Sequence, residues 1–111
     1  MMNVLRRALV AANIAFSTKM AVADGLQDGL TAAQAGDAIA QSNLGVMYFK
    51  GSGVSPDIVI AHMWLNIANA NGSEPAAGMR ARLERQMTPA EISGASRRAK
   101  LCMASSYADC D

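Results

Sequence analysis

The sequence has few of the residues from which metal sites and hydrolytic centres are built. Histidine occurs once, as His62, and cysteine twice, without a Cys-x-x-Cys pair or a Cys/His cluster. A structural zinc site therefore has too few ligands. The sequence contains no Ser-x-x-Lys motif, and His62 has no evident nucleophile beside it. We therefore expect no metal, no cofactor and no catalytic residue, and we expect His62 to be partly exposed.

Long apolar runs and alternating strand patterns are also missing. No stretch reaches the about 18 apolar residues that a membrane span needs, so we expect no stable membrane span. Runs of Val, Ile and Thr that alternate with polar residues are scarce, whereas Ala, Met and Leu are frequent. A chain of 111 residues has room for one small domain with a shared core. The sequence therefore predicts an all-α protein.

Charge of one sign is lacking as well, since the formal net charge is +1. Residues 1–23 hold three bases and no acid, so the rest of the chain carries about −2. This balance argues against a nucleic-acid partner. Most of the remaining bases lie near Glu84 and Glu91, which indicates the solvated face of two helices rather than a phosphate site; they are Arg80, Arg82, Arg85, Arg97, Arg98 and Lys100.

The N-terminus has the outline of a secretory signal peptide. A basic pair, Arg6-Arg7, precedes a mostly apolar segment over residues 8–16 and the small residues Ala21-Val22-Ala23. The pattern predicts a signal peptide over 1–23, cleavage before Asp24, and a periplasmic or secreted protein. A polar residue interrupts the apolar segment and a lysine follows it, so the alternative is an amphipathic helix retained in a cytoplasmic protein.

The two cysteines, Cys102 and Cys110, are the last landmarks of the chain. An even pair is what an exported protein oxidises, and the pair agrees with the signal peptide. We therefore predict a Cys102–Cys110 disulfide that folds the C-terminal tail back onto the last helix.

Two helices in the middle of the chain form a predicted αα-hairpin. A short helix over 24–35 ends at Gly36. The hairpin follows, with its first helix over 38–50 and its second ending at Asn71-Gly72. We expect the second helix to begin with Ser55 as N-cap and Pro56 at the first helical position, with Asp57 in the first turn. The apolar faces consist of Ala40, Leu44, Met47 and Tyr48 on the first helix, and Ala61, Trp64, Leu65 and Ala68 on the second.

Three glycines have distinct predicted roles in this hairpin. Gly45 lies inside a helix, where glycine is destabilising, so we expect a neighbouring backbone to approach it closely. Gly51 follows the last helical turn at the position that favours a left-handed residue, and Gly53 gives a second such point in the turn.

Two more helices are predicted after residue 73. Ser73-Glu74-Pro75 starts the first, whose apolar stripe is Ala76, Met79, Leu83 and Met87. Thr88-Pro89-Ala90-Glu91 is a capping box that starts the second. The core-facing residues of the second are Ile92, Ala95, Ala99, Cys102 and Met103.

Residues 36–72 resemble the Sel-one-like repeat, an αα repeat related to the tetratricopeptide repeat. The matching positions are Ala40-Gln41, Leu44-Gly45, Met47-Tyr48, Gly51, Gly53-Val54, Asp57, Ala61, Trp64 and Ala68 through Gly72. The closing "MTPAEI" and the Cys-x7-Cys pair look like the end of exported bacterial members. The resemblance implies a short αα-solenoid and an adaptor or scaffold role without catalysis.

Only one full repeat is present, although such repeats bury their faces against neighbours. We therefore expect the helices on either side to act as caps. The predicted division is a signal peptide (1–23), an N-terminal capping helix (24–36), the repeat (37–72), and a C-terminal helical hairpin with the disulfide tail (73–111).

A candidate partner-binding stripe lies on the helix over 38–50. Asn43, Val46 and Lys50 share one face with Phe49 beside it, away from the core face. By analogy with tetratricopeptide-like solenoids, the stripe faces a protein partner. The alternatives are that the stripe contacts a second copy of the chain or is covered by the helix over 24–35.

For the function as a whole, the alternative is a cell-envelope enzyme or small-ligand-binding protein related to disulfide-rich repeat proteins.

Overall fold

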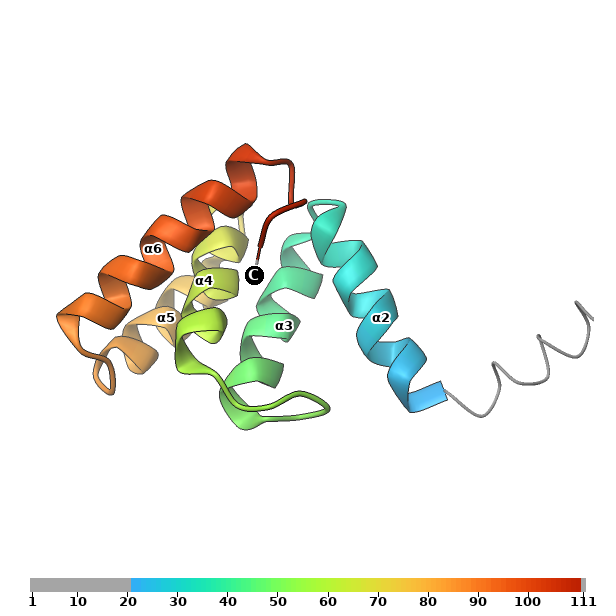
Figure 1. The fold of residues 1–111 in the computed structure, drawn as a ribbon, viewed down its shortest axis with the longest axis horizontal. Coiled ribbons are helices and arrows are strands. Elements are labelled where there is room, and N and C mark those ends of the chain that lie inside the picture. The colour runs from blue at the N-terminus through green and yellow to red at the C-terminus, as the bar shows by residue number, and fades with distance from the viewer. Residues whose placement is uncertain (1–20, 111) are drawn as a thin grey trace, which may run out of the picture.

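The described part of the chain is a row of antiparallel helices. The computed structural model describes residues 21–110, and this part contains five helices and no strand (Figure 1). The all-α prediction is therefore confirmed. The helices are α2 (Ala21–Gln34), α3 (Ala38–Lys50), α4 (Ile58–Ala70), α5 (Glu74–Glu84) and α6 (Pro89–Ala104). The predicted signal peptide lies outside the described residues apart from its last three, which belong to α2.

None of the helices within residues 21–110 has both the length and the apolar character needed to cross a membrane.

Helix α4 lies at the centre of the fold and packs against α3, α5 and α6 (Figure 1). Its Met63, Trp64 and Ile67 belong to one buried cluster, which also contains Leu44 of α3. A second cluster contains its Ala61, Leu65 and Ala68, together with residues of α5 and α6. Trp64 is only 3% exposed, so its predicted core position is confirmed. Because three helices surround α4, nearly its whole circumference is apolar and buried.

Gly45 lies where α3 approaches α4 closely. A Cβ atom at this position would lie 2.7 Å from Cγ of Leu65 and 3.1 Å from the main-chain oxygen of Ala61. Both distances are too short for a side chain to fit without movement. The expected packing reason for this glycine is therefore confirmed, and the two repeat helices can approach this closely because position 45 has no side chain.

The turn between α3 and α4 depends on two glycines with positive φ. Gly51 caps α3 with φ 74°, and its N–H donates to the main-chain oxygen of Met47; Gly53 has φ 77°. The Cγ atom of Pro56 lies 2.5 Å from where a Cβ of Gly51 would stand. The turn therefore needs glycine at position 51 for its backbone angle and also for space.

The predicted start of α4 is wrong by two residues. Asp57, not Ser55, is the N-cap: its Oδ1 accepts hydrogen bonds of 3.0 Å from the N–H groups of Val59 and Ile60. The main-chain N–H of Asp57 donates to the oxygen of Tyr48 across the hairpin at 2.9 Å. Since this bond and the packing of Pro56 on Gly51 hold residues 55–57 in the turn, the helix begins only at Ile58.

The C-terminal hairpin largely follows the sequence. Helix α5 ends at Glu84, so Met87 of the predicted stripe lies in the following turn, where it is still buried. The capping box of α6 is confirmed, because the Glu91 N–H donates to the Thr88 hydroxyl at 3.1 Å and the Thr88 N–H donates to the Glu91 carboxylate at 2.9 Å. Ala95, Ala99 and Cys102 are fully buried, and Ile92 and Met103 are half-buried.

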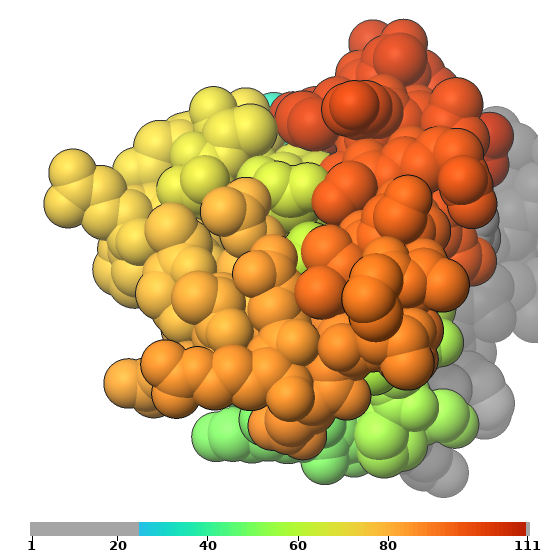
Figure 2. Space-filling model, turned by 90° about the vertical axis from the view of Figure 1, so that its left-hand side faces the viewer, coloured from blue at the N-terminus to red at the C-terminus, as the bar shows by residue number. Residues whose placement is uncertain are grey.

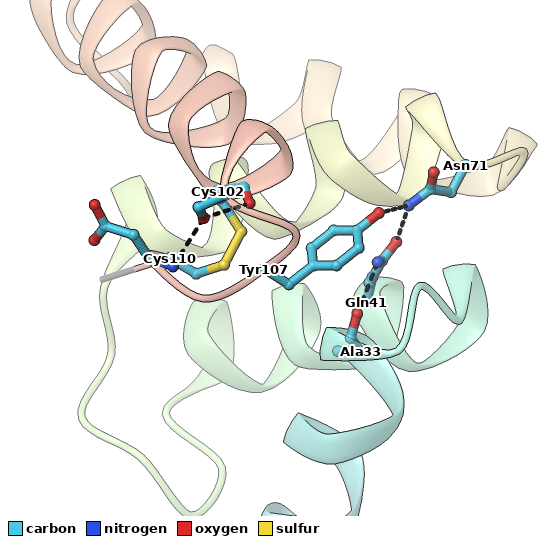
Figure 3. The surroundings of a disulfide bond; sticks show 8 residues. Ala33, Gln41, Asn71, Cys102, Tyr107 and Cys110 are labelled. Carbon is cyan, nitrogen blue, oxygen red and sulfur yellow. Dashed lines mark hydrogen bonds between the residues drawn. A yellow bond between two sulfur atoms is a disulfide. The ribbon is translucent and has the colours of Figure 1, made fainter.

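The C-terminal tail folds back as predicted. Cys102 and Cys110 form a disulfide, and the Tyr107 N–H donates to the Cys102 oxygen at 2.8 Å. The ring of Tyr107 points from the tail toward the start of α3 and the end of α4, where its hydroxyl accepts a hydrogen bond of 2.9 Å from the Asn71 side chain (Figure 3). The tail therefore connects the end of α6 to the end of α4.

Candidate functional site

An open groove lies between the C-terminal halves of α3 and α5. Short turns reverse the chain before and after α4, so α3 and α5 run in the same direction and end on the same side of the molecule. Figure 2 shows the residues around the end of α3 emerging beneath α5. The groove has a volume of about 390 Å³ and is lined by Val46, Phe49 and Lys50 of α3 and by Met79, Arg82, Leu83 and Gln86 on the side of α5.

Three of the four candidate partner-binding residues line this groove, namely Val46, Phe49 and Lys50. Asn43 is exposed one turn earlier on α3 and is not part of the lining. Neither Val46 nor Phe49 is among the apolar side chains that pack against the two buried clusters, and Phe49 is 39% exposed. The stripe therefore borders α5 across an open groove, and its role in binding a partner stays a prediction.

The second wall of the groove was not predicted. The sequence pattern assigned Met79 and Leu83 to a core stripe; Leu83 is indeed buried, but Met79 is only half-buried and also lines the groove. The wall residues follow a helical spacing of i, i+3, i+4 and i+7 from Met79 to Gln86. This spacing is visible in the sequence, but only the placement of α5 beside α3 shows that the face borders a groove.

The groove combines an apolar lining with two cations. Lys50 and Arg82 are exposed, lie in the last turns of their helices, and make no ion pair with another described residue. Cations are favoured at helix C-termini, which accounts for their place in the sequence. No carboxylate belongs to the lining within the described part of the chain. The groove is therefore positive at the end where α3 and α5 stop.

His62 is buried, so the expectation of a partly exposed histidine is wrong. It is 1% exposed because it faces α5 from the central helix, and its Nε2 lies 2.9 Å from Oε1 of Glu84. Arg80 lies 3.8 Å from the same carboxylate oxygen and donates to the side-chain oxygen of Asn66 at 2.8 Å. Glu84 is the only described residue that hydrogen-bonds to the imidazole. This group links α4 to α5 and contains no nucleophile.

The described residues also lack a metal-binding arrangement. Within residues 21–110, no three His, Cys, Asp or Glu side chains lie close enough together to hold a metal ion.

Consecutive helices run antiparallel, are joined by short turns and pack on their neighbours. This arrangement defines an αα-repeat protein of the solenoid class. Residues 38–73 match the family model of the Sel1 repeat, so α3, α4 and the turn between them form a Sel1-like repeat. The motif residues have clear structural roles: Gly45 and Ala61 at the helix contact, Tyr48, Gly51, Gly53 and Asp57 at the turn, and Trp64 in the core.

Sel1 repeats generally mediate protein–protein interactions, and the family is generally not enzymatic. No curated protein matches this chain.

Proposed function

We propose that this chain is a non-catalytic adaptor or scaffold module that binds another polypeptide in the groove between α3 and α5. The observation that carries the proposal is the open apolar lining. Val46, Phe49 and Met79 come from two helices, face the same space and remain accessible, although folding alone gives Phe49 no reason to lie there. Accessible apolar surface with a polar rim is typical of an interaction site.

The proposal includes export to the bacterial cell envelope. Two features support it: the basic and apolar pattern of residues 1–23, and the Cys102–Cys110 disulfide, which persists in oxidising compartments. The test is the intact mass of the protein recovered from the periplasm or medium. We expect a chain that starts at Asp24, and a protein that retains Met1 or Met2 would contradict export by cleavage.

Interaction through the groove is tested with the double variant Val46→Asp/Phe49→Asp. Two carboxylates in the apolar lining disfavour docking of an apolar partner surface, because they must be desolvated. We expect the wild-type chain to retain a polypeptide on affinity capture from the native envelope, and the double variant to lose it. The melting temperature is measured in parallel, since a large decrease would show that these side chains support the fold instead.

The matched control is Ile39→Asp/Leu101→Asp. Ile39 is 74% exposed on α3 and Leu101 is 56% exposed on α6, and neither lines the groove. The control therefore introduces the same two negative charges as the groove variant, but at exposed apolar positions outside the groove. Retention of the partner by the control and loss by the groove variant supports the proposal, whereas loss by both shows that charge alone prevents capture.

The volume of the groove favours a second candidate, a cell-envelope protein that binds a small ligand. About 390 Å³ lies within the range of about 300–1,000 Å³ that is typical of ligand pockets. Native mass spectrometry of protein purified from the envelope distinguishes the two. A small molecule retained by the wild type and lost from Val46→Asp/Phe49→Asp supports the second candidate over the first.

A further inference from the structure

We propose that the groove selects an acidic peptide segment, in which one or two carboxylates stand beside a large apolar side chain. This inference deepens the proposed function and rests on it. The groove has two different parts, and each part restricts the chemistry of what can bind.

The apolar part favours a large aliphatic or aromatic side chain. Val46 of α3 faces Met79 and Leu83 of α5 across the groove, and none of the three carries a group that can form a strong hydrogen bond. A bound apolar side chain would bury these surfaces without leaving a polar atom unpaired. Methionine also adapts its shape to different partners, so this wall tolerates more than one apolar residue type.

The charged part lies at one end of the groove. Lys50 and Arg82 stand in the last turns of two parallel helices, so both cations lie where α3 and α5 end, close to Phe49 and Gln86. Among residues 21–110 no carboxylate lines the groove, and neither cation is paired with another of these residues. A carboxylate next to the apolar anchor would bind this end, and Arg can hold it through two parallel hydrogen bonds.

The same charges disfavour the N-terminal segment of the chain as the occupant. Residues 1–20 contain three bases and no acid, so their binding would bring like charges together. The charge of the groove is instead complementary to acidic segments of another polypeptide. The orientation follows from the geometry: the carboxylate lies at the turns after α3 and α5, and the apolar anchor lies nearer the middle of the helices.

The probe for this inference is a displayed library of random short peptides, selected on the immobilised wild-type chain and, in parallel, on Val46→Asp/Phe49→Asp. We expect enriched peptides to carry Asp or Glu next to Leu, Phe or Met, and to be absent from the variant. Enriched peptides that depend on the groove but show no acidic bias would overturn the inference and leave the proposed function standing. An absence of groove-dependent peptides would contradict both.

Charge reversal gives the second measurement. For the most enriched acidic peptide, we expect Lys50→Glu/Arg82→Glu to weaken binding by about tenfold or more in a fluorescence titration. The matched control, Arg97→Glu/Lys100→Glu, changes two bases on α6 outside the groove and should change binding by less than about threefold. Equal losses in both variants would show only a long-range charge effect and would overturn the assignment of Lys50 and Arg82.

Sedimentation of the wild-type chain without peptide tests the remaining occupant, a second copy of the chain. We expect a monomer. A dimer that disappears in Val46→Asp/Phe49→Asp would overturn the inference, because the groove would then be an interface between copies.

Discussion

Gln41 of α3 donates a hydrogen bond of 2.9 Å from its side-chain Nε2 to the main-chain oxygen of Ala33 near the end of α2, and both residues are completely buried. Its Oε1 accepts a hydrogen bond from Asn71, whose side chain also donates to Tyr107 (Figure 3). One buried amide therefore connects α2, α3 and, through Asn71, the ends of α4 and the tail. These bonds connect the helices near the start of α3, whereas the charged part of the groove lies at the other end of α3.

Replacing Gln41 by Leu should destabilise the protein by about 1–3 kcal/mol, because it removes two hydrogen bonds, the one to the Ala33 oxygen and the one from Asn71. Tyr107→Phe removes a hydrogen bond at an exposed site, and we expect a smaller loss of about 0.5–1.5 kcal/mol. Chemical denaturation of the two variants measures both values. A Gln41→Leu protein as stable as the wild type would show that the amide network does not contribute to stability.

Opening the disulfide should loosen the tail and lower the stability of the whole domain. Cys102 and Cys110 are separated by 8 positions, and closure of so short a loop contributes about 2–3 kcal/mol in the chain-entropy model. We expect Cys102→Ala/Cys110→Ala to melt at a lower temperature than the wild type, by about 4–8 °C for each kcal/mol lost. In native protein purified without reductant, thiol titration should detect no free thiol, and two free thiols would contradict the pairing.

Local sequence signals predicted those features that neighbouring residues determine. The capping box at Thr88 needs only Glu91 three positions later, and a glycine directly after the last helical turn was enough to predict the positive φ at Gly51. The core face of α6 follows from helical periodicity alone. Each of these predictions is confirmed because no distant contact competes with the local preference.

The predictions that failed concern features decided by distant contacts. Ser55 and Asp57 are both good N-caps, and the bond from Asp57 to Tyr48 across the hairpin decides between them. The burial of His62 depends on Glu84, which is 22 positions away. The groove depends on α5 lying beside α3, so periodicity indicated the α3 stripe but could not identify its opposite wall.

The two glycines of the turn allow the cost of backbone angle to be separated from the cost of crowding. Gly51 and Gly53 both have positive φ, but only at Gly51 would a Cβ meet another residue, the ring of Pro56. Gly53→Ala should therefore cost about 1–2 kcal/mol, the strain of a side chain at positive φ. Gly51→Ala should cost more, since Pro56 must also move. Denaturation curves that show equal losses would contradict the role of Pro56.

Truncation of Trp64 should leave a cavity at the centre of the fold. Trp64 is 3% exposed and lies in a buried cluster with Met63 and Ile67, so Trp64→Ala should cost about 3–5 kcal/mol. This is a large fraction of the stability of a small domain, and we expect partial or complete unfolding at room temperature, measured by circular dichroism. Leu101→Ala is the control, since an exposed leucine on α6 should change stability by less than about 0.5 kcal/mol. A melting temperature of Trp64→Ala close to that of the wild type would contradict a core role.

Glu84 should stabilise the contact of α4 with α5 mainly by accepting the hydrogen bond from His62. A carboxylate oxygen only accepts, so the proton lies on Nε2 of the imidazole, and Nδ1 is left without a partner among the described residues.

In Glu84→Ala the buried Nε2–H loses its acceptor, and we expect a loss of about 1–3 kcal/mol. Glu84→Gln keeps a side-chain oxygen at the same place, so its effect should be smaller although the charge next to Arg80 is gone. The unfolding free energies of the two variants separate the two contributions: a larger loss in Glu84→Ala identifies the hydrogen bond as the main one, whereas equal losses would assign the stabilisation to the charge of Glu84.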